Sequence, residues 1–293
     1  MSQSKKEIIQ MIFEFIRKNI DILKKNKYKM IACDLDGTLF GSDLRVSKEN
    51  NQAISEFFKR GIPFVPCTGR TLSEMEEMVE NPDIRYIIYS NGAGILDKKT
   101  GERIGNGFPH EVKGRLFDIL SGYEFFPLVH ADGKCYMNGN FKGKEIEYNL
   151  PDAIRRIVNN TVIPFSDFEK EFSNKEVESL SIFFKNKDER EKCREQLASD
   201  DMLVVSESWS LNLEVFYVGA GKANGIKILA DKLGIDIKEV ISIGDSGNDA
   251  EALEICGLGI CVSNGNDEIK KVADEIACSN NENVAEYILR KYF

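Results

Sequence analysis

Two aspartates stand two positions apart in the segment IACDLDGTLF, which runs from Ile31 to Phe40. Asp34 and Asp36 follow a short apolar run and lead into a Gly-Thr turn. In an extended segment, residues i and i+2 point to the same side, so both carboxylates would be directed at one point. Two carboxylates this close repel unless a cation lies between them or one takes up a proton. A Mg²⁺ ion held by carboxylates and a substrate phosphate meets that need, and one aspartate stays free to attack.

The same residues admit two other interpretations. An Asp-x-Asp-Gly sequence can open a calcium-binding loop, but that loop needs further oxygen ligands and a closing Glu. Gly37 is followed by Thr-Leu-Phe-Gly-Ser, which excludes it. A plain surface turn also fits, because Asp-Gly is a turn dipeptide. The segment alone leaves a site and a turn both open, so the rest of the chain must decide.

Composition limits the partners of the protein. The chain has 293 residues, which is long enough for two domains. Its formal net charge of −9 argues against nonspecific binding to nucleic acid or to an anionic membrane. A small phosphorylated metabolite remains compatible, because a metal ion and a few local cations can dominate a site. The seven cysteines form no Cys-x-x-Cys pair, which indicates a reducing cytoplasm instead of a disulfide framework or a zinc site.

Residues 1–28 predict an N-terminal helical extension. Apolar residues recur at helical spacing between Ile8 and Leu23. Glu14 and Arg17 interrupt them, so the segment predicts neither a signal-peptide core nor a membrane span. Its basic residues would also suit a membrane surface. We favour packing on the protein itself or self-association through this helix.

Strands and helices alternate in residues 29–93 and 218–293. This alternation of predicted strands and helices is typical of parallel βαβ units. It predicts an α/β core with a Rossmann-like, doubly wound parallel sheet. Ser47 is the expected N-cap of one helix, and Gly61 its stop. The predicted strands are 29–33, 62–67, 85–89, 239–243 and 258–262, and the predicted helices are 47–60, 73–80, 223–233, 248–256 and 268–272.

Residues 94–217 have a different pattern of apolar and polar residues, which predicts a second α/β module inserted into the first. Alternating segments at 134–137 and 179–184 indicate strands. Helical segments are expected at 111–120, 150–158 and 188–198. Both histidines of the chain, His110 and His130, lie in this module, and we expect surface or packing roles for them more than substrate contacts.

Polar residues gather at the predicted carboxyl ends of the core strands. Asp34, Thr68, Asn91 and Asp245 each follow a different strand. Ligands of open parallel α/β sheets bind at these ends, so we expect one shared crevice.

Two segments could hold a phosphate. Thr68 and Gly69 precede a predicted helix, where a hydroxyl and backbone N–H groups can form an anion-binding nest. A simple strand-to-helix turn is the alternative. Lys222 opens another predicted helix and could hold a phosphate as a point charge, although a solvated lysine is the default. Phe216 and Ala223 stand where a P-loop needs Gly and Ser or Thr, which excludes that motif.

A third cluster closes a strand and opens a helix in the sequence GDSGNDAEAL. Asp245 would complete the oxygen ligands of a metal, while Asn248 and Asp249 would orient water, metal and phosphate. Asp and Asn are also good helix N-caps. Capping explains one of these residues and not the whole cluster.

Together these motifs resemble those of the haloacid dehalogenase superfamily in order and spacing. More narrowly, the chain is similar to the Cof-like sugar-phosphate phosphatases, in which a cap domain is inserted after the second motif, as residues 94–217 would be. The resemblance covers residues 29–293. The four motifs are Asp34-Leu-Asp36-Gly-Thr38, Cys67-Thr68-Gly69-Arg70, Lys222, and Gly244-Asp245-Ser-Gly-Asn248-Asp249.

The resemblance implies a role for each site residue. Asp34 would be the nucleophile that forms an aspartyl-phosphate, and Asp36 the general acid and base. Mg²⁺ would be bound by the Asp34 side chain, the Asp36 carbonyl and Asp245. The phosphate would be held by Thr68, Gly69, Lys222 and Asn248, and the supporting residues would be Thr38 and Asp249.

The implied function is a Mg²⁺-dependent phosphatase acting on small phosphomonoesters, sugar phosphates first. A pyridoxal-phosphate phosphatase or a phosphomannomutase-like phosphotransferase remains open as an alternative. A non-enzymatic alternative is a phospho-acceptor switch similar to a response-regulator receiver. Asp36 argues against that switch, because a long-lived aspartyl-phosphate is incompatible with a general base beside it.

Overall fold

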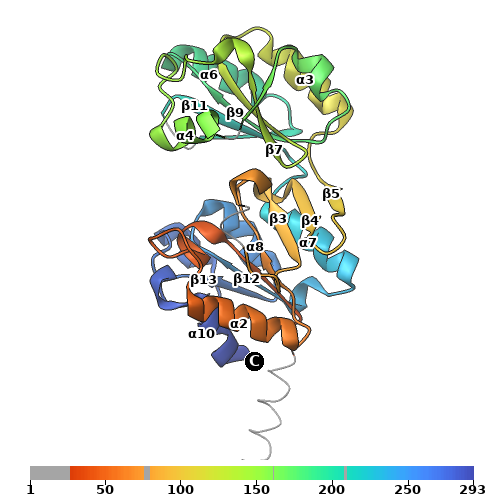
Figure 1. The fold of residues 1–293 in the computed structure, drawn as a ribbon, viewed down its shortest axis with the longest axis vertical. Coiled ribbons are helices and arrows are strands. Elements are labelled where there is room, and N and C mark those ends of the chain that lie inside the picture. The colour runs from red at the N-terminus through yellow and green to blue at the C-terminus, as the bar shows by residue number, and fades with distance from the viewer. Residues whose placement is uncertain (1–26, 76–79, 161, 208–209) are drawn as a thin grey trace, which may run out of the picture. The chain divides into compact units, whose positions relative to one another are not determined.

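The structure, a computed structural model, describes residues 27–75, 80–160, 162–207 and 210–293 (Figure 1). The chain divides into two compact units, which are described separately. Unit 1 consists of Met1–Val65 and Ala230–Phe293, and unit 2 consists of Pro66–Leu229.

Unit 1 is built around a five-stranded sheet. The spatial order is β14 (Glu275–Ile276), β13 (Leu258–Cys261), β12 (Val240–Gly244), β1 (Met30–Cys33) and β2 (Phe64–Pro66). The ladders β1–β12, β12–β13 and β13–β14 are parallel. Strands β1 and β12 are buried along their whole length, as expected for apolar runs covered on both faces. The predicted α/β class with a parallel sheet is confirmed.

Helix boundaries follow the predicted caps. Helix α2 (Lys48–Lys59) begins after Ser47, whose side chain accepts a hydrogen bond from the Asn50 backbone N–H. It ends before Gly61, which has a φ of +72°. A residue in this left-handed region is a usual helix stop, and glycine adopts it without strain.

Helices α8 (Ala250–Ile255) and α9 (Asp267–Val272) pack on strand β13. Their shared core contains Leu253, Cys261 and Ile269, all buried. The helices predicted at 248–256 and 268–272 are therefore confirmed, the first with a short 3-10 turn before α8.

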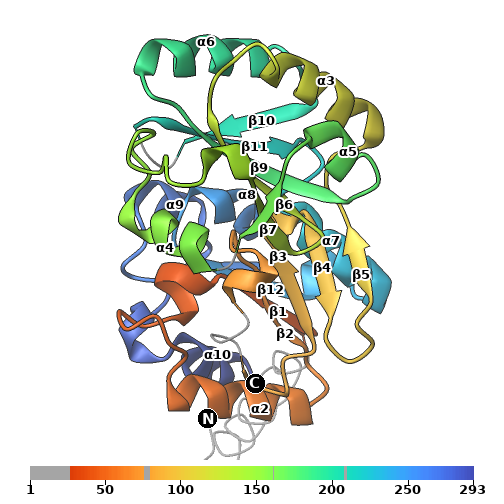
Figure 2. The same cartoon turned by 45° about the horizontal axis from the view of Figure 1, so that its top comes forward.

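Helix α2 lies beside α10 (Val284–Tyr292) in both views (Figures 1 and 2). Phe57 of α2 is fully buried. Its ring stacks on Phe64 at a centroid distance of 6.0 Å and meets Phe293 edge-on at 5.2 Å. One aromatic side chain thus joins the helix, the edge strand β2 and the last residue of the chain.

Unit 2 contains a three-stranded antiparallel sheet of β3 (Tyr86–Tyr89), β4 (Gly94–Asp97) and β5 (Arg103–Gly105). The strand predicted at 85–89 is confirmed. The predicted start of the insertion, residue 94, falls inside this sheet, at the first residue of β4. The boundaries of the inserted module stay a prediction.

The rest of unit 2 is built on a six-stranded sheet. Its ladders are antiparallel except β7–β8, which is parallel. The strands predicted at 134–137 and 179–184 correspond to two of its members. The spatial order is β10 (Leu203–Ser206), β11 (Asn212–Tyr217), β9 (Val177–Phe183), β6 (Phe126–Ala131), β7 (Lys134–Asn138) and β8 (Ile163–Phe165).

Apolar cores of buried side chains include residues of this six-stranded sheet and of the helices around it. One core includes buried residues of α3 (His110–Leu120), α5 (Phe168–Phe172) and α6 (Lys187–Leu197). Another includes Val158 of α4 (Asp152–Asn160). The helices predicted at 111–120, 150–158 and 188–198 are confirmed.

Two predictions fall wholly or partly outside the described residues. The N-terminal helical extension predicted at 1–28 lies outside the described residues except for 27 and 28, and the helix predicted at 73–80 includes the undescribed residues 76–79. The described part of the latter is only a 3-10 turn, Leu72–Glu74. In the portion of the chain that the structure describes, no helix is both long and apolar enough to cross a bilayer.

We predict that Phe57→Ala destabilises the protein by about 3 to 5 kcal/mol, because it removes a fully buried aromatic ring and leaves a cavity. The neighbouring Phe58, 55% exposed on the same helix, provides the control. Phe58→Ala should change stability by less than about 0.5 kcal/mol. Urea unfolding of both variants measures the difference, and equal losses would contradict the packing described here.

Candidate active site

Asp34 lies where strand β1 ends. Its backbone N–H donates to the Ile243 carbonyl over 2.9 Å, which continues the parallel pairing of β1 with β12 by one residue. Its carbonyl accepts the Leu39 N–H at 3.2 Å, so the chain turns back at once. Asp34 is only 5% exposed. The sheet therefore holds Asp34 in a place that is largely shielded from solvent.

The expectation of an extended segment from Asp34 to Asp36 is wrong. Residues Leu35–Leu39 form a tight helical turn, interrupted by non-helical backbone at Asp36 and Gly37. Gly37 has a φ of +78°, which favours glycine. The directions of the Asp34 and Asp36 side chains relative to each other are thus set by this turn and not by the side-to-side alternation of a strand.

Asp245 follows strand β12, and Asp249 supports the loop that begins there. One oxygen of Asp249 accepts the backbone N–H groups of Asp245 at 3.1 Å and Ser246 at 3.2 Å. Gly244 permits this arrangement, because a Cβ at that position would lie 2.4 Å from the same oxygen. Asp249 is 2% exposed. Its carboxylate therefore closes a capping box as the N3 residue, with Ser246 as the N-cap, whereas the capping alternative predicted an Asp or Asn as the N-cap itself.

Three carboxyl groups converge at this end of the sheet. Asp34, Asp245 and Asp249 each offer an oxygen, and these oxygens lie within 4.8 Å of one another. The sequence predicted Asp34 and Asp245 as metal ligands and Asp249 as a supporting residue, so the inclusion of the Asp249 carboxylate is new. The predicted contribution of Asp36 was through its backbone carbonyl, and its carboxylate is not part of this group.

This acidic group fits a divalent cation. Three negative charges so close together repel strongly in a partly buried place, and a hard cation with oxygen ligands relieves that repulsion. Space around Asp245 is restricted, since a Cβ on Gly37 would lie 2.6 Å from one of its oxygens. The Thr38 hydroxyl, fully buried, is 3.5 Å from the other oxygen and donates to it. The possible metal ligands are thus all carboxylate oxygens. The Asp245 carboxylate is also kept in place by the Thr38 hydrogen bond and by the close approach of Gly37.

Two asparagines, not predicted as functional, hold the loop that follows Asp36. The side-chain amide of Asn264 donates to the Gly37 carbonyl at 2.7 Å, and its oxygen accepts the Asn280 backbone N–H at 2.8 Å. Asn280 in turn donates to the Phe40 carbonyl at 2.9 Å. Their only signal in the sequence is a high density of asparagine after the strand predicted at 258–262.

The predicted phosphate-binding residues lie partly in unit 1 and partly in unit 2. Asn248, in unit 1, is exposed, and its side-chain oxygen accepts from the Ser246 hydroxyl at 2.9 Å. Thr68, Gly69 and Lys222 belong to unit 2. The alternative of a solvated lysine is wrong, because Lys222 is 2% exposed at the start of α7 (Lys222–Leu233). A buried ammonium group requires anionic or carbonyl partners.

Thr68 is also buried, at 1% exposed. Its backbone N–H donates to the Ile88 carbonyl at 3.0 Å, and its hydroxyl oxygen accepts the Arg70 backbone N–H at 3.1 Å. The hydroxyl proton is not used in that bond and can be donated elsewhere. Gly69 is exposed. The segment therefore has the turn geometry expected of either a phosphate-binding loop or a plain strand-to-helix turn.

The two histidines have the environments that packing or surface roles require. His110 is exposed at the first turn of α3. His130 lies on β6, and its Nδ1 is 2.8 Å from the Ser179 hydroxyl. Burial lowers the pKa of His130, which favours the neutral ring.

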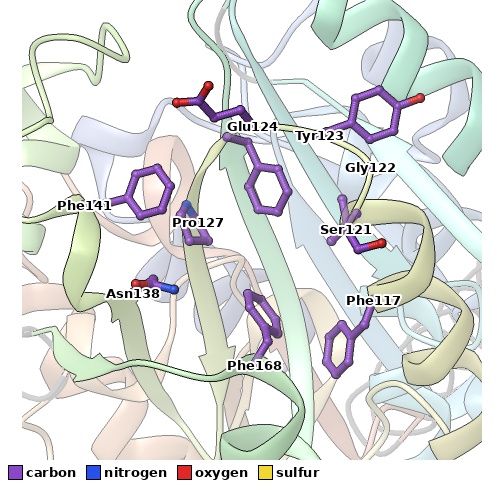
Figure 3. Close-up of a pocket in the computed structure, with 11 residues that line it drawn as sticks. Phe117, Ser121, Gly122, Tyr123, Glu124, Pro127, Asn138, Phe141 and Phe168 are labelled. Carbon is purple, nitrogen blue, oxygen red and sulfur yellow. The ribbon is translucent and has the colours of Figure 1, made fainter.

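Unit 2 also contains an aromatic pocket of about 390 Å³ (Figure 3). Rings of Phe117, Phe141 and Phe168 line it, and Glu124 is the charged residue among the described side chains around it. Glu124 accepts hydrogen bonds from Tyr148 at 2.8 Å and Lys185 at 2.9 Å. This pocket does not have the clustered carboxylates that phosphoryl chemistry needs, so the candidate active site is the acidic group of unit 1.

A family model for haloacid dehalogenase-like hydrolases matches residues 31–289, which includes every site residue discussed above. The chain belongs to this family. The resemblance to this superfamily and its Cof-like branch is confirmed. The fold agrees, since a haloacid dehalogenase-like hydrolase from Bacteroides thetaiotaomicron superposes with a TM-score of 0.74 at 24% identity, over 91% of this chain and 100% of that one.

Several curated relatives of this hydrolase are named phosphatases. Phosphatase YwpJ of Bacillus subtilis is 31% identical, over 89% of this chain and 99% of the relative. The 5-amino-6-(5-phospho-D-ribitylamino)uracil phosphatase YwtE of the same organism is 27% identical, over 89% and 96% respectively. The chain is thus an enzyme of the phosphatase type.

We predict that MgCl₂ stabilises the folded protein against heat, because the cation binds the acidic group only when it is assembled. At a concentration one hundred times the dissociation constant, the gain should be about 2.7 kcal/mol. Asp245→Asn should abolish the gain, whereas Glu268→Gln, which changes an exposed acid on α9, should keep it. Differential scanning calorimetry with MgCl₂ and with EDTA measures the effect. A stabilisation that survives Asp245→Asn would place the cation elsewhere.

Proposed function

We propose that this chain is a Mg²⁺-dependent phosphatase that hydrolyses small phosphomonoesters, sugar phosphates first, through an aspartyl-phosphate on Asp34. The observation that supports this most is the acidic group of Asp34, Asp245 and Asp249 at the end of a buried parallel sheet. Such a group is costly unless a cation offsets its charge, and a cation is what phosphoryl transfer requires.

In the first step, a carboxylate oxygen of Asp34 attacks the phosphorus atom of the substrate. The bond between phosphorus and the ester oxygen breaks, and that oxygen takes a proton from Asp36. In the second step, water attacks the same phosphorus and gives its proton to Asp36. The bond to Asp34 breaks, and inorganic phosphate leaves. Covalent catalysis divides the reaction into two easier steps, and one carboxyl group serves both as acid and as base.

Phosphoryl transfer depends mainly on positioning and electrostatics. We propose that Asp34, Asp245 and the Asp36 carbonyl hold Mg²⁺, which would offset negative charge on the phosphoryl oxygens. Asp249 and Thr38 would keep Asp245 in place through the contacts described above. The residues proposed to hold the remaining phosphoryl oxygens are Thr68, Gly69, Lys222 and Asn248.

The relatives support a polyhydroxy substrate. The name of YwtE describes a phosphate ester on a ribityl chain, which is chemically close to a sugar phosphate. We propose the cytoplasm as the location, because the seven cysteines of the sequence do not have the pattern of a disulfide framework. Phosphate release from sugar phosphates, pyridoxal phosphate and nucleotides, with MgCl₂ and with EDTA, tests the substrate class. Release restricted to pyridoxal phosphate, or transfer only with a bisphosphate activator, would contradict it.

We predict that Asp34→Asn abolishes phosphate release, because the amide is not a nucleophile. Asp36→Asn should lower kcat by about 10²- to 10⁴-fold, the usual contribution of general acid–base catalysis. Asp267→Asn, an exposed carboxyl group on α9, serves as the control and should leave kcat unchanged. Steady-state kinetics on the best substrate of the panel measures all three. Wild-type kcat in a folded Asp34→Asn variant would refute the assignment of the nucleophile.

A further inference from the structure

A turn made of Ser90, Asn91 and Gly92 contacts both segments of unit 2 that we propose to hold phosphate. The Ser90 N–H donates to the Arg70 carbonyl, and the Asn91 N–H donates to the Thr68 carbonyl, each at 2.9 Å. The turn therefore holds the Thr68–Arg70 segment at both ends through the backbone.

The other side of this turn packs on the segment that leads into α7. A Cβ on Gly92 would lie 2.1 Å from the Gly221 carbonyl oxygen and 3.2 Å from the Lys222 nitrogen, so only glycine allows this approach. The Asn106 side chain donates to the carbonyls of Gly92 at 3.2 Å and Gly219 at 2.7 Å, which fixes the two backbones together. Any displacement of the turn would move the start of the Lys222 helix as well.

The backbone of the turn is strained. All three residues have positive φ, +49° at Ser90, +51° at Asn91 and +86° at Gly92. Two consecutive residues with side chains rarely adopt this left-handed region. Such a conformation persists only where surrounding contacts enforce it, and it is common at functional sites. One side-chain contact to this turn comes from the six-stranded sheet.

Glu178 of β9 supplies that contact. Its carboxylate accepts a hydrogen bond from the Ser90 hydroxyl at 2.9 Å and another from the Gly133 N–H at 2.6 Å. The β6–β9 ladder pairs His130 with Ser179 and Ala131 with Val177, so Glu178 has no partner in it. A bulge of this kind changes the direction of a side chain, and such bulges are common beside active sites.

The surroundings of Glu178 make its charge state important. The residue is 1% exposed, and burial raises its pKa to about 7. The groups that face it are the Tyr89 hydroxyl of β3, which hydrogen-bonds to it, and the Arg103 guanidinium of β5, which favours the charged form. Asp132, next to Gly133, interacts with Tyr89. The ionised carboxylate accepts from Ser90, Tyr89 and Gly133 together, whereas a protonated carboxyl must use one oxygen as a donor.

We propose that Glu178 is a positioning residue of the enzyme, which holds the 90–92 turn and through it the backbones of Thr68 and Lys222 in the geometry that binds phosphate. This inference rests on the proposed function. Glu178 is not proposed to take part in the bond-breaking steps. Its contribution reaches the phosphate only through the strained turn.

Amide hydrogen exchange of the full chain tests the structural part without any substrate. Glu178→Gln removes the charge at constant size, and Ser90→Ala removes one donor with little risk to folding. Both variants should accelerate exchange in peptides that contain the Ser90 and Asn91 amides. Ser179→Ala, which removes a side-chain hydrogen bond from the same strand, should leave exchange there unchanged. Wild-type protection in both test variants would overturn the proposal.

The pH profile of kcat/KM, measured with p-nitrophenyl phosphate, tests the catalytic part. We expect wild-type kcat/KM to fall as the pH drops through about 7, because Glu178 becomes protonated. Glu178→Gln should lose that step and fall about 10- to 100-fold below the wild-type plateau at high pH, the range expected for displaced binding groups. The second ionisation of the substrate phosphate affects every variant equally. A wild-type profile in Glu178→Gln would overturn the proposal.

As the pH rises through about 7, the contribution of Glu178 to stability should decrease while kcat/KM increases. Because the pKa of Glu178 is raised in the folded protein, protonation stabilises the fold. This stabilisation is complete below the unfolded pKa near 4.5 and is lost as the pH rises through about 7. The melting temperature of the wild type should therefore fall relative to that of Glu178→Gln across this window. If the wild type releases no phosphate from any substrate, the proposed function fails, while exchange and melting still decide whether Glu178 holds the turn.

Discussion

Repulsion among three carboxyl groups is the constraint on which the candidate active site depends. Oxygens of Asp34, Asp245 and Asp249 lie within 4.8 Å of one another. The protein tolerates this because strands β1 and β12 fix two of the groups and because Asp249 is neutralised in part by backbone N–H donors. The three oxygens are close enough to share a divalent cation, and we propose that such a cation supplies the remaining compensation. Under this proposal, the crowding of the three carboxyl groups would favour a small, hard cation with oxygen ligands.

Glycines and asparagines make such crowding possible. Gly37 and Gly244 leave space beside carboxylate oxygens where any Cβ would collide. Asn264 and Asn280 satisfy carbonyl groups of the loop after Asp36, which has no regular strand or helix to pair with. In unit 2 the strained turn at 90–92 has a comparable role for Thr68 and Lys222. In both units, side chains hold irregular backbone in place beside residues that we propose to be catalytic or phosphate-binding.

Sequence patterns predicted the elements well, because apolar runs and capping residues are local signals. Ser47 and the left-handed Gly61 bound α2 as expected, and the motif residues follow the strands that were predicted to carry them. The extended path from Asp34 to Asp36 was wrong, since the chain enters a tight helical turn at Leu35, directly after Asp34. Three further features depend on contacts between distant segments and have no local signal: the approach of Asp249 to Gly244, the Asn264–Asn280 pair, and the contact of Glu178 with Ser90. The catalytic roles of the motif residues stay predictions.

The central claim is that Asp34 becomes phosphorylated during turnover. Acid quenching of the Asp36→Asn variant during reaction with substrate and MgCl₂, followed by peptide mass spectrometry, tests it most directly. The account predicts a phosphoryl adduct on the peptide that contains Asp34, because the intermediate can form but loses the base that activates water. The adduct should be absent with EDTA and in Asp34→Asn. Phosphate release without any adduct at Asp34, or an adduct at another residue, would contradict the account.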